Sequence, residues 1–147
     1  MSTVPATARS ATSPASETLR RALRIDAWST AAFGVVLLAG ATLLVVPFGL
    51  PVYWSIPFGI AMLGGAASLG LIAGYPRIPT KFAIFVIAGN ALSFVALVAL
   101  TFSNLIPLTG FGIIFFLSGA LVVAAFAIAE SIGLRLNFSA SERLRDE

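Results

Sequence analysis

The chain has 147 residues, of which 59% are hydrophobic and only 10% are charged, and its formal net charge is +3. A soluble domain carries roughly 25% charged residues, so this composition predicts a surface that faces lipid. The absence of cysteine and histidine excludes disulfides and thiolate metal sites, and it removes the usual near-neutral acid–base group. The excess of basic residues is expected to face anionic lipid headgroups and not nucleic acid.

The N-terminal region divides into two segments before the first long apolar stretch. Residues 1–15 are mainly Ser, Thr, Ala and Pro and offer little apolar surface to bury, which predicts a disordered tail. Residues 16–25 alternate Leu19 and Leu23 with three arginines. This pattern predicts an amphipathic segment at the membrane interface whose arginines reach the headgroups.

Four long uncharged apolar stretches follow, and each approaches the ~20 residues that cross a hydrocarbon core of ~30 Å. Continuous runs of this length favour helices over strands, because only a helix satisfies its backbone hydrogen bonds within one segment. The short links between them predict an all-α, up-down transmembrane four-helix bundle. We expect this domain at 26–135, with helices at about 27–46, 54–74, 82–101 and 108–129, and a cytoplasmic C-terminal tail at 136–147.

The basic residues give this bundle an orientation. All nine fall before the first stretch, in the link at 75–81 or after the fourth stretch, and the other two links contain none. The positive-inside rule then places both termini in the cytoplasm, which is an N-in/C-in topology in the inner (cytoplasmic) membrane of a cell.

Two acidic residues border the apolar domain. Asp26 is expected to begin the first helix and Glu130 to end the fourth, which would bring both to the cytoplasmic boundary. The preferred interpretation is that they form ion pairs that fix the helix ends, because a charge near the boundary costs less than one at mid-bilayer. The expected partners are Arg24, Arg77, Lys81 and Arg135. The alternative is a proton or cation site made by two carboxylates on neighbouring helices.

Asn90 is the one amide or acid well inside an apolar stretch, where Ser93 and Leu97 share its helical face. Ser68 and Ser118 are expected at comparable depth on neighbouring helices. The preferred interpretation is an interhelical hydrogen bond, which stabilises a membrane bundle by about 0.6 kcal/mol and up to roughly 1.7. The alternative is that Asn90 lines a polar pocket for a small ligand.

The second apolar stretch is rich in small residues and contains a GxxxG sequence from Gly70 to Gly74. Small residues let two helix backbones approach closely in lipid. The sequence leaves two interpretations open, which are packing within one chain and the contact face of a homodimer or a larger membrane complex.

Several segments together resemble a family of small four-pass bacterial integral membrane proteins that has no assigned activity. The segments are RRALRIDAWSTAAFG (20–34), FGLP (48–51), AGNALSFVALVAL (88–100) and GFGIIFFLSGALVVAAFAIAESIGLRL (110–136). The resemblance implies the four-helix architecture, and it draws attention to Arg24, Asp26, Asn90, Glu130 and Arg135 as an intramembrane polar or ion-pair site. Members often carry a glutamine midway along the fourth helix, where this chain has Ser118 and its apolar neighbours.

No phosphate-binding loop, nucleophile–base pair or metal-ligand cluster is present in the sequence. We therefore expect a protein that is not an enzyme and has no cofactor, such as an accessory or scaffold protein of the membrane. A small dimeric transporter is one alternative, although no acidic residue lies mid-way along the first stretch as in small multidrug transporters. A lipid- or quinone-binding membrane protein is the other.

Overall fold

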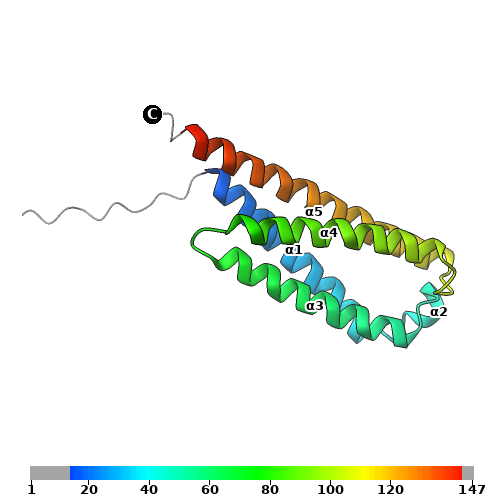
Figure 1. The fold of residues 1–147 in the computed structure, drawn as a ribbon. Coiled ribbons are helices and arrows are strands. Elements are labelled where there is room, and N and C mark those ends of the chain that lie inside the picture. The colour runs from blue at the N-terminus through cyan, green and yellow to red at the C-terminus, as the bar shows by residue number, and fades with distance from the viewer. Residues whose placement is uncertain (1–13, 144–147) are drawn as a thin grey trace, which may run out of the picture.

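The computed structural model describes residues 14–143, and this part of the chain consists of helices joined by short links, with no strands (Figure 1). The helices are α1 (Pro14–Ala39), α2 (Val45–Phe48), α3 (Val52–Gly74), α4 (Thr80–Phe102) and α5 (Gly110–Arg143). The prediction of an all-α bundle of four long apolar helices is confirmed.

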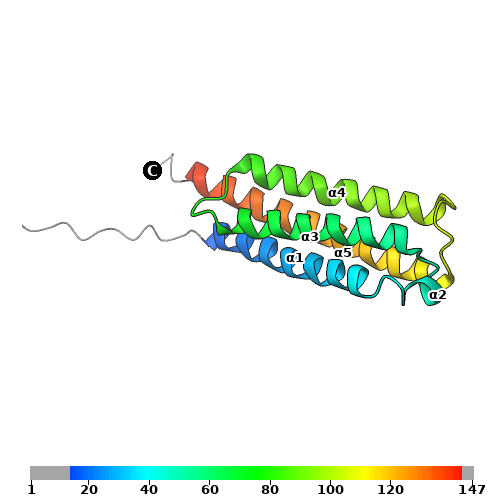
Figure 2. The ribbon, with the colours of Figure 1, turned by 90° about the horizontal axis from the view of Figure 1, so that it is seen from below.

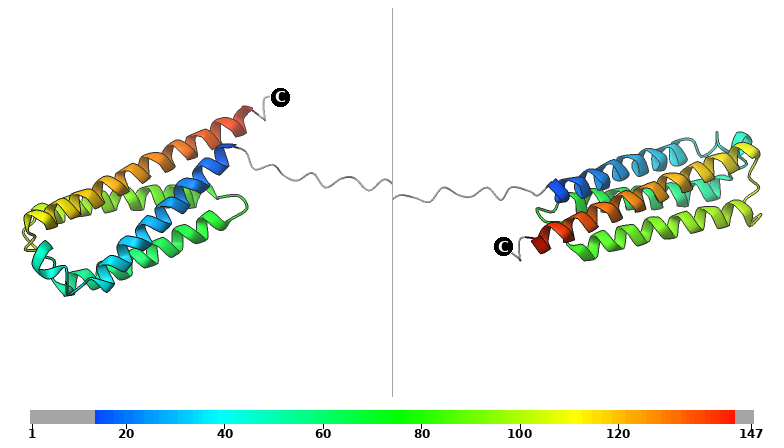
Figure 3. Two further views of the ribbon diagram at one scale, coloured as in Figure 1. Left: turned by 180° about the vertical axis from the view of Figure 1, so that it is seen from behind. Right: turned by 90° about the horizontal axis from the view of Figure 1, so that it is seen from above.

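The four long helices run up and down along a common direction. The start of α1, the α3–α4 link and the end of α5 lie at one end of the bundle, and α2 lies at the other with the α4–α5 link (Figure 2). Helix α1 packs against both α3 and α5, and α5 also packs against α4. Both views of Figure 3 show the bundle as an elongated body. By contrast with the other neighbouring helices, α3 and α4 barely touch, although they are consecutive in the chain. The edge between α3 and α4 is therefore the loosest seam of the bundle.

All four long helices have the length and hydropathy needed to cross a membrane. Many of their large apolar side chains face outward, including Phe85 at 73% exposure and Leu92 at 70%. Lipid is the solvent that such a surface requires, because exposed apolar patches of this extent are rare on soluble monomers. The fold is that of a multi-pass membrane protein.

Helix bounds differ from the predicted ones at both ends of the domain. Helix α1 begins at Pro14 and ends at Ala39, so the stretch predicted to reach residue 46 breaks into a turn and the short helix α2. The chain stays apolar through this break, so hydropathy does not reveal it. Helix α5 continues past Glu130 to Arg143, and no proline interrupts it there. The predicted tail at 1–15 falls mostly outside the described residues.

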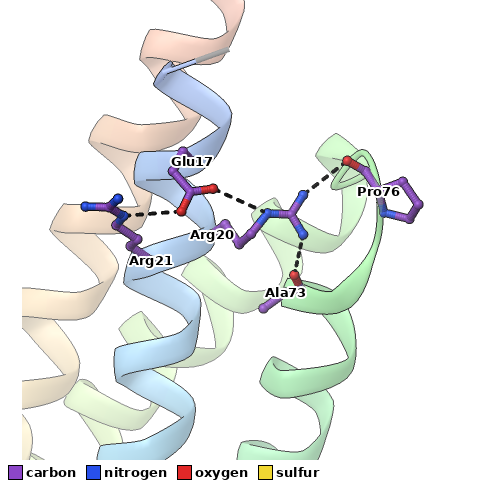
Figure 4. Close-up of polar contacts among 5 residues, drawn as sticks. All are labelled: Glu17, Arg20, Arg21, Ala73 and Pro76. Atoms are coloured by element: carbon purple, nitrogen blue, oxygen red, sulfur yellow. Dashed lines mark hydrogen bonds and ion pairs between the residues drawn. The ribbon is translucent and has the colours of Figure 1, made fainter. Parts of the chain in front are cut away.

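The segment at 16–25 is the first part of α1, and one of its faces packs against the rest of the bundle. Leu19 and Leu23 are buried in a core cluster with side chains of α3 and α4. The guanidinium of Arg20 donates hydrogen bonds to the carbonyl oxygens of Ala73 (2.6 Å) and Pro76 (3.1 Å), at and just beyond the end of α3 (Figure 4). Because the last carbonyls of a helix have no partner within it, Arg20 fixes α1 against α3 at this end.

Close packing of α1 on α3 depends on Gly34 and Gly59, and Gly59 is one of the small residues of the second apolar stretch. A Cβ on Gly59 would lie 2.6 Å from the Leu38 side chain and 3.0 Å from the Gly34 carbonyl oxygen. At Gly70 and Gly74, the GxxxG pair, a Cβ would meet nothing within 4 Å. The GxxxG sequence therefore does not mediate packing within the chain.

The other end of the bundle is held together by contacts of α2 and Gly49 with the α4–α5 link. Thr109 donates from its backbone nitrogen to the Phe48 oxygen (3.1 Å) and from its hydroxyl to the Pro47 oxygen (2.6 Å). Gly49 adopts a left-handed conformation with φ of 64°, and any Cβ there would collide with the backbone of the α4–α5 link.

Candidate functional site

A polar cluster lies where α1, α4 and α5 meet, and three side chains from three helices form it. The Asn90 side-chain nitrogen donates to Asp26 Oδ2 (2.8 Å) and to Glu130 Oε2 (3.1 Å). Asp26 and Glu130 are both completely buried, at 0% exposure. The two carboxyl groups are near neighbours, because an oxygen of each lies within hydrogen-bond distance of the same nitrogen. Asn90 thus joins two acidic groups that lie far apart in the sequence.

The preferred interpretation of these acids as ion-pair partners has to be corrected. Within residues 14–143 the ion pairs are those of Glu17 with Arg20 (3.9 Å) and Arg21 (3.2 Å) (Figure 4). Asp26 and Glu130 contact no arginine or lysine there. The physical reason is that α1 starts well before Asp26 and α5 continues well beyond Glu130, so both acids project from inside a helix.

The basic residues expected beside the acids lie elsewhere. Arg24 and Arg135 belong to the same helices as the acids but are exposed, and Arg77 is exposed in the α3–α4 link. Lys81 is also exposed, with its ammonium group 5.2 Å from the centre of the Phe82 ring. The structure therefore brings together Asp26, Asn90 and Glu130 of the five predicted site residues, and it leaves Arg24 and Arg135 outside the cluster.

The hydrogen bonds of the two acids are unequal. Asp26 Oδ1 accepts from the Thr30 hydroxyl (2.9 Å), and Asp26 Oδ2 accepts from Asn90. Glu130 Oε2 accepts from Asn90, but Glu130 Oε1 is buried and has no hydrogen-bond partner. Thr30 was missed by sequence reasoning, although its position four residues after Asp26 on a helix is the signal that would have found it.

A cavity of about 420 Å³ adjoins the cluster and is lined by all four long helices. Its size is within the range of about 300–1,000 Å³ that small-molecule sites occupy. Most of the lining is apolar and includes Phe33, Met62 and Phe116. The polar lining side chains are Ser29, Thr30, Ser68, Asn90 and Ser93. Asn90 is thus both the bridge between the acids and part of the cavity wall.

The cavity lies along the loose seam between α3 and α4. On the α4 side, Gly89 and Ser93 both line the cavity and are exposed, and on the α3 side the same is true of Gly65 and Ser68. An added Cβ at Gly65 or Gly89 would meet nothing within 4 Å. The opening therefore faces sideways, toward the medium that surrounds the bundle. Ser118, which was expected at the depth of Asn90, does not line it.

The chemistry available in this site is hydrogen bonding and charge. Within residues 14–143, no group of three or more His, Cys, Asp or Glu side chains lies close enough together to hold a metal ion. The Ser29 hydroxyl donates to the Asp26 carbonyl oxygen (3.1 Å), the Thr30 hydroxyl donates to the Asp26 carboxyl group (2.9 Å), and the Ser68 hydroxyl donates to the Gly64 carbonyl oxygen (2.9 Å). These groups offer oxygen lone pairs to a molecule in the cavity.

Comparison with known proteins adds no assignment to this geometry. No protein-family model matches the chain, and neither a curated protein nor a solved structure does. The site has to be interpreted from its own residues.

Proposed function

We propose that this membrane protein binds a lipophilic molecule in the cavity between its four helices and does not act as an enzyme. The observation that carries the proposal is the apolar cavity of about 420 Å³, whose few polar lining groups include Thr30 and Asn90, both bonded to the buried acids. Concave, mostly apolar sites with a small number of convergent polar groups are typical of ligand-binding sites.

The polar lining indicates which end group the ligand carries. Both hydrogen bonds of the Asn90 amide nitrogen go to the buried acids, so the Asn90 carbonyl oxygen is the atom left for a ligand. The hydroxyls of Ser29, Thr30 and Ser68 also donate within the protein and keep their lone pairs. A head group that donates hydrogen bonds, such as an alcohol or an amine, satisfies these acceptors, and an ether or ester does not.

The seam between α3 and α4 supports entry of the ligand from the lipid. These helices barely touch, and exposed cavity-lining residues lie on both sides of the opening. A long apolar chain can therefore reach the cavity sideways, without passing between the links at the ends of the bundle.

The orientation that we propose is that both termini face the cytoplasm across the cytoplasmic membrane. The described cations belong to one end of the bundle, at the start of α1, in and after the α3–α4 link, and toward the end of α5. The positive-inside rule supports a cytoplasmic location for that end.

A photo-crosslinking experiment tests the ligand. The protein in nanodiscs is labelled with a long-chain fatty alcohol that carries a diazirine group, and the labelled positions are mapped by mass spectrometry. We expect labelling of cavity-lining residues such as Met62 and Phe116, with competition by the unmodified alcohol and none by its methyl ether. Gly65→Leu would fill the cavity and remove most of this labelling.

Gly64→Leu is the matched control, because Gly64 is the adjacent residue, has equal free space around its Cβ and does not line the cavity. This variant should be labelled as the unchanged protein is. Two results would overturn the proposal. One is labelling spread evenly over the lipid-facing side chains with no effect of Gly65→Leu, and the other is crosslinking of the seam to a second copy of the chain.

A further inference from the structure

We infer that Asp26 and Glu130 share one proton at neutral pH, so that the polar cluster is an occupied proton site. This inference does not depend on what the cavity binds. It starts from the position of two completely buried carboxyl groups that accept hydrogen bonds from the same amide nitrogen.

Two carboxylates held side by side away from water cannot both be ionised without strong repulsion, and a single proton between them turns the contact into a hydrogen bond. The Asn90 amide donates one hydrogen bond to each group, and the Thr30 hydroxyl donates a second to Asp26. These neutral donors stabilise a negative charge on the pair, but they do not replace a positive charge.

No neighbouring group supplies that positive charge within residues 14–143. On α1 the nearest cation in sequence is Arg24, on α4 it is Lys81, and on α5 it is Arg135, and all three are exposed and form no ion pair with the acids. Helix α3 contains no acidic or basic residue at all. A proton is therefore the charge that the site needs.

A second observation supports the inference independently. Glu130 Oε1 is buried and has no hydrogen-bond donor. An ionised carboxylate with a bare buried oxygen is strongly disfavoured, whereas a neutral carboxylic acid tolerates it far better. A metal cation does not fit the site as well as a proton, because the Asn90 amide hydrogens already point at the oxygens that would have to bind the metal.

Infrared spectroscopy of the full chain tests the inference. The protein is reconstituted in vesicles of ether-linked phospholipids, which have no ester carbonyl, and the spectrum is recorded at neutral pH. We expect a carbonyl band of a protonated carboxylic acid that shifts in D2O. Glu130→Gln and Asp26→Asn each leave a single acid in the cluster and should abolish or shift this band.

Glu17→Gln is the matched control, since Glu17 is partly exposed and paired with arginines, and its replacement should leave the band unchanged. Absence of the band in the unchanged protein would overturn the inference, and that measurement does not require any variant to fold. A band that stays at the same position and intensity in both Glu130→Gln and Asp26→Asn would overturn it as well. So would a band that appears only when Na⁺ and K⁺ are replaced by choline, because the site would then hold an alkali cation.

Discussion

The bridge made by Asn90 can be tested by replacing it with a side chain of similar size that cannot donate hydrogen bonds. Asn90→Leu removes the bonds to Asp26 (2.8 Å) and Glu130 (3.1 Å) and leaves both acceptors without this donor. Interhelical hydrogen bonds of this kind contribute about 0.6 kcal/mol on average and up to roughly 1.7 each. Two of them predict a loss of about 1–3 kcal/mol, which is roughly a 5- to 150-fold change in the unfolding equilibrium.

The assay is reversible unfolding of the purified protein in mixed detergent micelles, followed by circular dichroism. Ser93→Leu is the control, because Ser93 follows Asn90 by three residues, lines the same cavity and makes no side-chain hydrogen bond within residues 14–143. We expect the control to unfold like the unchanged protein.

An Asn90→Leu variant that is no less stable than Ser93→Leu would refute this prediction. That result would mean that the hydrogen bonds to the acids contribute nothing net, and that Asn90 matters only as part of the cavity wall. A loss well above 3 kcal/mol would point instead to collapse of the whole contact between α1, α4 and α5.

Two further predictions concern packing and orientation. Gly59→Ala should lower the free energy of unfolding by about 1–3 kcal/mol, because its Cβ would lie 2.6 Å from the Leu38 side chain. The control Gly64→Ala should be neutral or slightly stabilising. Equal unfolding curves for the two variants would contradict the α1–α3 contact. Because the chain contains no cysteine, single cysteines at the exposed positions Ser103 and Thr80 can be labelled with a membrane-impermeant reagent. We expect labelling from outside intact cells at position 103 and none at position 80, and the reverse pattern would rule out the proposed orientation.

The residues of the cluster were all visible in the sequence, but their relation was not. Asp26 and Glu130 stood out as acids beside apolar stretches, and Asn90 as an amide inside one. Hydropathy predicted that the acids lie at helix ends near the membrane boundary, where a charged group paired with arginine costs little free energy. The helices actually continue past both acids, and this change in bounds turns a boundary ion pair into a buried cluster.

Composition and hydropathy by themselves determined the membrane class and the four long helices, because lipid requires uncharged segments of a fixed length. Tertiary structure alone decided which helices touch. The seam between α3 and α4, the cavity along it and the contact of Asn90 with two acids depend on how the helices are rotated and packed. These helices are apolar around most of their circumference, so the sequence carries almost no signal of which face turns inward.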